Sequence, residues 1–262
     1  MLSREFIIAN SFLLVTQAAL VALPGRGIPR WLDRLKGPAW ALILPFSIAI
    51  VVAAVAAIPR VADGLTWVAL ILVPIGATLA LGWAMHHARR PYAIIAAALF
   101  VFAVVETGTL AGDAAAAALT ALSAITVGRL LAGLVPGVYL RLGIITMAMI
   151  DAYLVFSEKL QGPNATLNAA IPVHGAPQLQ YLELHYASMG YGDVFVAGVL
   201  GGILAAERKP QLPAAVLVLI LASLFDLLFL HFNTLPATVP IAIATVLLWL
   251  PIRRRPGVYA AS

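Results

Sequence analysis

Four acidic residues stand inside long apolar runs of the chain, where a charged side chain needs a partner or a function. They are Glu106, Asp151, Asp193 and Asp226. An ionisable group in the hydrocarbon of a bilayer is costly, so such residues are often functional. Asp151 and Asp193 fall in consecutive runs, each about seven residues, or roughly 10 Å at 1.5 Å per residue, from the ends that meet on one side. Two carboxylates on antiparallel helices at one depth can face each other.

A facing pair of carboxylates has a defined chemistry. Held close in a low-dielectric site, the two groups cannot both ionise, so they share one proton. One can then act as base toward a water molecule and the other as acid toward a carbonyl oxygen, which is the chemistry of aspartic proteolysis. A coupled pair titrates as a unit, so neither aspartate is assigned as the base. Two buried acids that are hydrogen-bonded only for packing are the alternative.

The remaining polar residues disfavour other kinds of protease chemistry. Neither His-Glu-x-x-His nor Gly-x-Ser-x-Gly occurs, which disfavours zinc and serine proteases. The chain has no cysteine, which removes thiolate catalysis and cysteine-ligated metals. We therefore expect neither a metal nor a cofactor. Glu106 lies near the end of its run and can reach the interface; for Asp226 we expect a structural partner, His231 or an arginine.

The composition sets the environment in which these acids work. Of the 262 residues, 63% are hydrophobic and only 10% are charged, and the mean hydropathy is +1.01. Soluble chains average about 25% charged residues. There is too little polar surface for a water-exposed globule, which excludes a soluble enzyme, a disordered regulator and a secreted disulfide scaffold. The sequence predicts an all-α integral membrane protein.

Apolar runs long enough to cross a bilayer occur nine times, since one span needs about 20 residues. The longest connection between runs, 158–184, is expected as an external loop. We divide the single membrane domain into a five-helix scaffold over 1–134 and a catalytic four-helix part over 135–262. The expected spans are 6–23, 39–58, 66–85, 92–111, 114–134, 137–157, 185–206, 212–232 and 235–252.

Basic residues divide unequally between the two sides of nine spans. Cytoplasmic loops collect Lys and Arg, and here 13 of the 16 basic residues fall on one side, the others being Arg4, Arg60 and Lys159. This division predicts an external N-terminus and a cytoplasmic C-terminus that carries Arg253, Arg254 and Arg255. The excess of Arg over Lys and the high Ala content favour a prokaryotic plasma membrane. We expect the bilayer, and no nucleic acid, as a partner.

The segment around the second acid reads Gly190-Tyr191-Gly192-Asp193. Glycines on both sides of Tyr191 allow close approach of another backbone at the start of the helix, and so can aim the carboxylate and admit a peptide. This segment resembles the motif of the intramembrane aspartyl proteases, the presenilin and signal peptide peptidase family. The sequence from Tyr186 to Val196 is similar to the signal peptide peptidase branch in particular, as is the aromatic-rich stretch from Asp151 to Phe156.

The resemblance implies an arrangement of the whole chain. In that family the first aspartate lies in the sixth of nine helices, Gly-x-Gly-Asp in the seventh, and Pro-Ala-Leu opens the ninth. Asp151, Asp193 and Pro236-Ala237-Thr238 occupy those places here. A presenilin-like fold, cleavage of transmembrane helices or leftover signal peptides, and no metal or cofactor are therefore expected. The residues that would shape the substrate cleft are Gly190, Tyr191, Gly192, Pro236, Ala237, Thr238 and Tyr153.

Three positions depart from the family pattern. Ile150 stands where family members usually have Tyr, and Leu235 stands where Gln is usual. Thr238 ends the third motif in place of Leu. The first departure removes a hydroxyl near the two acids, for which Tyr153 or Tyr191 is the expected substitute. The backbone role of Pro236 is kept, because proline donates no hydrogen bond and leaves a carbonyl nearby free.

Other functions remain open from the sequence. Met189 to Asp193 also resembles a potassium-channel filter, although a channel gives Asp151 no role. Prepilin peptidases share Gly-x-Gly-Asp but usually have Lys two positions later, where Phe195 stands. A proton-coupled transporter could use the acids as a relay.

The external loop has two stretches of alternating apolar residues, Leu167 to Val173 and Gln178 to Tyr186. Such stretches are typical of strands, and an extended substrate could pair with one of them. A plain surface loop is the alternative.

Overall fold

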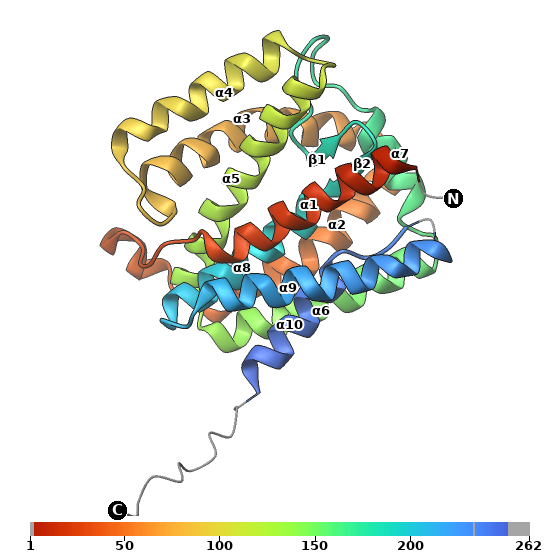
Figure 1. Cartoon of the computed structure of the whole chain (residues 1–262). Coiled ribbons are helices and arrows are strands. Elements are labelled where there is room, and N and C mark those ends of the chain that lie inside the picture. The colour runs from red at the N-terminus through yellow and green to blue at the C-terminus, as the bar shows by residue number, and fades with distance from the viewer. Residues whose placement is uncertain (1–2, 233, 251–262) are drawn as a thin grey trace, which may run out of the picture.

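The computed structural model describes residues 3–232 and 234–250. Arg253, Arg254, Arg255, the last residues of the expected ninth span and the expected cytoplasmic C-terminus lie outside these residues. The described chain is mostly helical, and its helices gather into one bundle (Figure 1).

Six helices of the described residues are long and apolar enough to cross a membrane. Three shorter apolar helices accompany them, namely α4 (Ala93–Val105), α8 (Tyr191–Ala206) and α10 (Thr238–Trp249). The six long ones are α1 (Arg4–Ala22), α2 (Ile43–Ala57) with the 3₁₀ turn Pro38–Leu42 before it, α3 (Val61–Leu79) with the π turn Ala80–Ala84 after it, α5 (Leu110–Leu134), α6 (Gly137–Phe156), and α9 (Gln211–Phe225) with the 3₁₀ turn Asp226–Leu230 after it.

Large apolar side chains on the outer helices face away from the protein. Ile50 of α2, Ile71 of α3 and Leu224 of α9 are each more than half exposed. A soluble protein rarely leaves so much apolar surface in water, whereas lipid tails solvate it. The chain is an all-α, membrane-embedded protein.

The centre of the bundle is a close contact between α5 and α8. A Cβ added at Gly128 would lie 2.2 Å from the carbonyl carbon of Gly198, and one added at Gly202 would lie 2.5 Å from the carbonyl oxygen of Gly128. Only glycine allows backbones to approach so closely, as is typical of helix pairs in membranes. The α8 helix is thereby packed backbone to backbone against α5.

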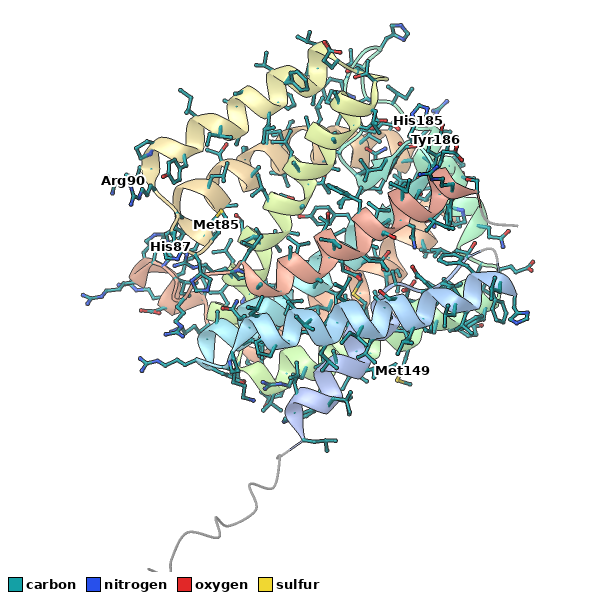
Figure 2. All side chains as sticks on the ribbon, viewed as in Figure 1. Met85, His87, Arg90, Met149, His185 and Tyr186 are labelled. Atoms are coloured by element: carbon teal, nitrogen blue, oxygen red, sulfur yellow. The ribbon has the colours of Figure 1, made fainter. Side chains whose placement is uncertain are left out.

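The basic connections meet at one end of the bundle. The guanidinium of Arg129, near the end of α5, donates to the carbonyls of Arg26, Gly27 and Trp83, and lies 4.0 Å from the centre of the Trp83 ring. It therefore ties the α1–α2 and α3–α4 connections together. In Figure 2, Met85, His87 and Arg90 lie at this end, on the left, and His185 and Tyr186 lie on the right.

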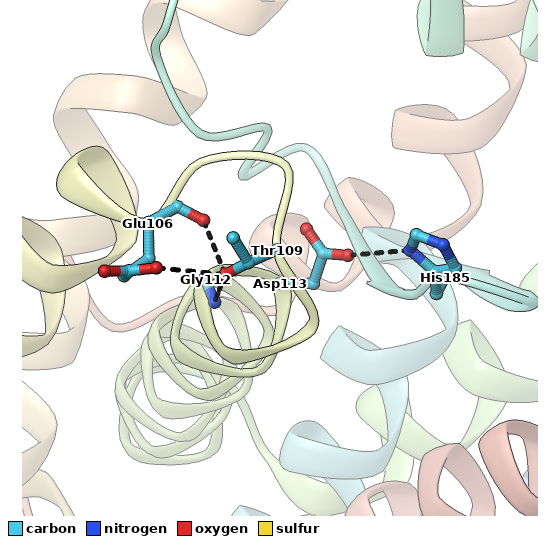
Figure 3. Close-up of polar contacts among 5 residues, drawn as sticks. All are labelled: Glu106, Thr109, Gly112, Asp113 and His185. Atoms are coloured by element: carbon cyan, nitrogen blue, oxygen red, sulfur yellow. Dashed lines mark hydrogen bonds and ion pairs between the residues drawn. The ribbon is translucent and has the colours of Figure 1, made fainter.

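A β-hairpin stands at the end opposite the basic connections. Its strands β1 (Tyr181–Leu184) and β2 (Ala187–Gly190) pair antiparallel, with Tyr181 opposite Gly190. His185 in the turn faces Asp113 of α5 across 3.7 Å, next to the Thr109 side chain that caps α5 (Figure 3). The His185 side chain is half exposed, so this contact, which is an ion pair only when His185 is protonated, contributes at most about 1 kcal/mol.

The hairpin corrects the expected start of the seventh span. A helix was expected from residue 185, but Ala187–Gly190 is strand and α8 begins at Tyr191. The reason is the tight turn at His185, which has φ 44° and reverses the chain so that β2 pairs with β1. The expected extended stretch Gln178 to Tyr186 contains β1. The one at Leu167 to Val173 is wrong in its first part, because Gln161–Ala169 forms helix α7.

Candidate active site

A cavity of about 650 Å³ lies inside the bundle, and both Asp151 and Asp193 line it. Asp151 comes from α6 and Asp193 from α8, and Gly192, the neighbour of Asp193, lies against Met147, one turn before Asp151. Most of the remaining wall is apolar and comes from α1, α2, α3, α5 and α9. The structure thus brings together the two acids that the sequence places in consecutive spans.

Asp151 is held on the buried face of α6. Its side chain is 3% exposed, and Met147 and Val155, one turn before and after it, are buried as well. The hydroxyl of Thr238 donates to Asp151 Oδ2 over 2.6 Å. Thr238 is the first residue of α10 and is fully buried. The residue that departs from the family motif therefore supplies a direct hydrogen bond to one of the two acids.

Asp193 is the third residue of α8, directly after the hairpin. A Cβ added at Gly190 would lie 3.4 Å from Asp193 Oδ2, so the carboxylate folds back toward the end of β2. A Cβ added at Gly192 would lie 3.1 Å from Cε of Met147. Glycine at 192 therefore lets the start of α8 pack against α6 one turn from Asp151. Both glycines line the cavity, as expected.

The two candidate tyrosines lie in different surroundings. The Tyr191 hydroxyl is 3.0 Å from Ser123 Oγ of α5, and the ring lines the cavity. Tyr153, expected at the cleft, is 59% exposed, and its hydroxyl accepts a hydrogen bond from Lys159 over 2.6 Å. Two positions along an α-helix rotate the side chain by about 200°, so Tyr153 points to the face of α6 opposite Asp151. Tyr153 does not line the cavity.

The Pro236-Ala237 segment leads into α10 beside the acids. Ala237 lines the cavity, and its carbonyl accepts a hydrogen bond of 3.2 Å from Nε2 of Gln17 in α1. The same Nε2 donates to the backbone carbonyl of Asp193 over 3.4 Å. Pro236 is buried behind the wall, and its carbonyl accepts from Val239 N–H over 3.2 Å.

Gln17 and Asn10 are cavity residues that the sequence analysis missed. Both line the cavity from α1, and Asn10 Nδ2 donates to Asp226 Oδ2. They are seven positions apart and so share one face of a helix. That spacing of polar residues within an apolar run was the available signal. Within residues 3–232 and 234–250, Asp226 pairs with Asn10, and not with His231 or an arginine as expected.

Glu106 lies at the C-terminal end of α4, where its carbonyl accepts from the Thr109 hydroxyl over 2.8 Å (Figure 3). Within residues 3–232 and 234–250, no three His, Asp or Glu side chains are grouped so that they could hold a metal ion. No known protein family matches the chain, and neither a curated protein nor a solved structure does so.

Proposed function

We propose that the protein is an intramembrane aspartyl protease of the presenilin and signal peptide peptidase type, with nine membrane helices, an external N-terminus and a cytoplasmic C-terminus. The single observation that carries the proposal is that Asp151 and Asp193, from two helices, line one mostly apolar cavity. The six long and three shorter apolar helices support the count of nine.

The pair would hydrolyse a peptide bond by acid–base catalysis. One carboxylate takes a proton from a water molecule as its oxygen attacks the peptide carbonyl carbon, while the carboxylic acid protonates the carbonyl oxygen. The tetrahedral intermediate then collapses, the C–N bond breaks, and the amine leaves with a proton from the pair. The products are a carboxylic acid and an amine, and the pair returns to its singly protonated state.

An apolar cavity suits an apolar substrate. The chemical class that fits the wall is a membrane-spanning helix or a leftover signal peptide, unwound locally because a hydrogen-bonded helix hides its carbonyls. No metal or cofactor enters this scheme. The strand β2 ends at the exposed Gly190, three positions before Asp193, so an extended substrate that pairs with the hairpin would lead to the acids.

A proton-coupled transporter is the second candidate, and one observation favours it. Asp226 lines the same cavity as Asp151 and Asp193, so three carboxylates are available to carry protons. The channel function fits less well, because Met189 is paired in β2 and Tyr191 begins α8, whereas a filter needs stacked free carbonyls. A prepilin-peptidase-like protease would use the same pair from the cytoplasmic side.

The test is cleavage of a labelled transmembrane peptide by purified protein in lipid vesicles. Wild type should cleave, and Asp151→Asn and Asp193→Asn should each lose activity to background. Glu106→Gln is the matched control, since it removes an acid that lies outside the cavity, and it should cleave like wild type. Cleavage at the wild-type rate by either aspartate variant would refute the pair, and proton-coupled solute uptake without cleavage would favour the transporter.

A further inference from the structure

Gln17 lies beside the two acids, and only one of the two polar atoms of its side-chain amide is hydrogen-bonded within the described residues. The residue is 1% exposed. Its Nε2 donates to the carbonyls of Asp193 and Ala237, as described above. Its Oε1 is buried and accepts no hydrogen bond from any residue of the described chain, although Gln17 lines the cavity.

The orientation of this amide is determined by its neighbours. Two carbonyl oxygens can pair only with the NH₂ group, so a flipped amide would set three oxygens against one another. Oε1 is therefore the atom left over. An acceptor without a partner in a buried site is unfavourable, and a native protein normally satisfies it. Because Gln17 lines the cavity, a molecule bound there is one source of the missing donor.

A second buried acceptor in the cavity wall also lacks a hydrogen-bond donor. Gln180, directly before β1, is 8% exposed and lines the cavity. Its Nε2 donates to the Leu167 carbonyl over 3.4 Å, and within the described residues its Oε1 also has no partner. An unwound peptide has the opposite need, because its N–H groups have lost their helical acceptors in a medium without water. Surplus acceptors on the wall match surplus donors on the substrate.

We propose that Gln17 is a substrate-positioning residue whose Oε1 accepts a hydrogen bond from a backbone N–H next to the bond that is cut. This inference rests on the proposed protease function and adds a direct contact with the peptide backbone. The Nε2 of the same amide holds the carbonyl of Asp193 itself and that of Ala237, the neighbour of Thr238, which binds Asp151. A peptide N–H bound to Oε1 is thus placed relative to both carboxylates.

The inference is tested by removing single N–H groups from the substrate. Synthetic transmembrane peptides carry an ester in place of one amide, at each bond flanking the scissile one in turn. Wild type should lose about tenfold in kcat/KM at one such position, the usual size of one hydrogen bond. Gln17→Met should cleave the all-amide peptide about tenfold more slowly. The ester at that position should not lower the kcat/KM of Gln17→Met any further.

Gln211 provides the matched control. Its Nε2 also holds backbone carbonyls of two segments, those of Val21, Pro24 and Gly201, at 3.0 to 3.2 Å. Its Oε1, however, is paired with His86 at 2.8 Å, and the residue lies outside the cavity. Gln211→Met should therefore still cleave the ester peptide about tenfold less efficiently than the amide peptide. Its loss of thermal stability should be comparable to that of Gln17→Met. Gln17→Leu replaces Gln17→Met if that variant does not fold.

An ester effect of equal size in wild type and in the Gln17 variant would overturn the inference, as would the absence of any sensitive position in wild type. Binding separates this failure from that of the protease proposal. In Asp193→Asn, where no cleavage is expected, the amide peptide should bind about tenfold more tightly than the ester, and equally once Gln17→Met is added. If the amide and ester peptides bind equally well to Asp193→Asn, as they should to the double variant, the role of Gln17 is refuted and the protease proposal is not. If wild type does not cleave, the protease proposal is refuted.

Discussion

The hydroxyl of Thr238 donates a hydrogen bond of 2.6 Å to Oδ2 of Asp151, and so links the first residue of α10 to the buried face of α6. Both side chains are almost fully buried. Hydrogen bonds to a charged or partly charged group are stronger than neutral ones, and they fix the direction in which the carboxylate points. The contact therefore orients one member of the proposed catalytic pair.

Replacing Thr238 by Val, which has the same shape without the hydroxyl, is expected to lower kcat/KM by about 10- to 100-fold, since a hydrogen bond to a charged group contributes about 1.5–3 kcal/mol. Thr238→Ser should recover most of the activity. The measurement is cleavage of a labelled transmembrane peptide in vesicles.

The control for this variant is Thr245→Val, two turns further along α10. Thr245 is also fully buried, but its hydroxyl donates to the Ile241 carbonyl of its own helix over 2.8 Å. Its loss should change the unfolding temperature but change kcat/KM by less than about twofold. Equal losses of activity in both variants would mean that Thr238 acts through packing alone.

Cleavage should be greatest at an intermediate pH. If Asp151 and Asp193 share one proton, activity falls at low pH, where the base is protonated, and at high pH, where the acid has lost its proton. The measurement is kcat/KM against pH in vesicles, for a substrate without ionisable groups near the cleaved bond. A rate that stays constant across the whole range in which the fold survives would rule out a shared proton.

Glu207 gives a pH-dependent contribution to stability at the basic end of the bundle. Burial acts to raise the pKa of Glu207, but hydrogen bonds from Arg141 at 2.5 Å and Lys209 at 3.0 Å outweigh it, so the pKa lies below its usual value. A lowered pKa means that the stabilisation is present above the unfolded pKa of about 4.3 and is lost as pH falls through the folded one. Glu207→Gln should therefore unfold at a lower temperature than wild type at neutral pH.

The difference between wild type and Glu207→Gln should shrink below about pH 4 and vanish once Glu207 is protonated in the folded protein. Asp33→Asn provides the comparison, because the Asp33–Lys36 pair is half exposed on both sides and should contribute little at any pH. A Glu207 effect that is the same at pH 7 and at the lowest pH tested would show that the ion pair does not cause it.

Gly128 should not tolerate even a methyl group. Gly128→Ala would place Cβ 2.2 Å from Gly198 in α8, where backbone and not a flexible side chain stands in the way. Overpacking of this kind costs about 1–3 kcal/mol or more, so we expect a large drop in unfolding temperature in detergent. Gly64→Ala in α3 has open space around the new Cβ and should be neutral or slightly stabilising. Similar unfolding temperatures for the two variants would contradict the close α5–α8 contact.

Residue types and spacing were enough to predict that Asp151 and Asp193 would lie at one cavity, because hydropathy locates apolar helices and helical rise then sets the depth of each acid. Hydropathy cannot tell an apolar strand from an apolar helix, and so β2 was assigned to the seventh span. The reversal at His185 that makes it a strand depends on pairing with β1, a contact between segments. The same reason hides the hydrogen bond from Thr238 to Asp151 and the bonds of Gln17 and Asn10, since the partners lie on other helices.

The backbone contact between α5 and α8 has a consequence for how the cavity changes shape. Gly128, Gly198 and Gly202 bring the backbones of α5 and α8 into direct contact, so we expect the helix that carries Asp193 to be the less mobile side of the pair. Thr238 couples α10 to Asp151 on the other side. If the protein acts as proposed, we expect that admitting a polypeptide from the bilayer displaces α6 and α10 together, and that the return of these two helices restores the position of Asp151.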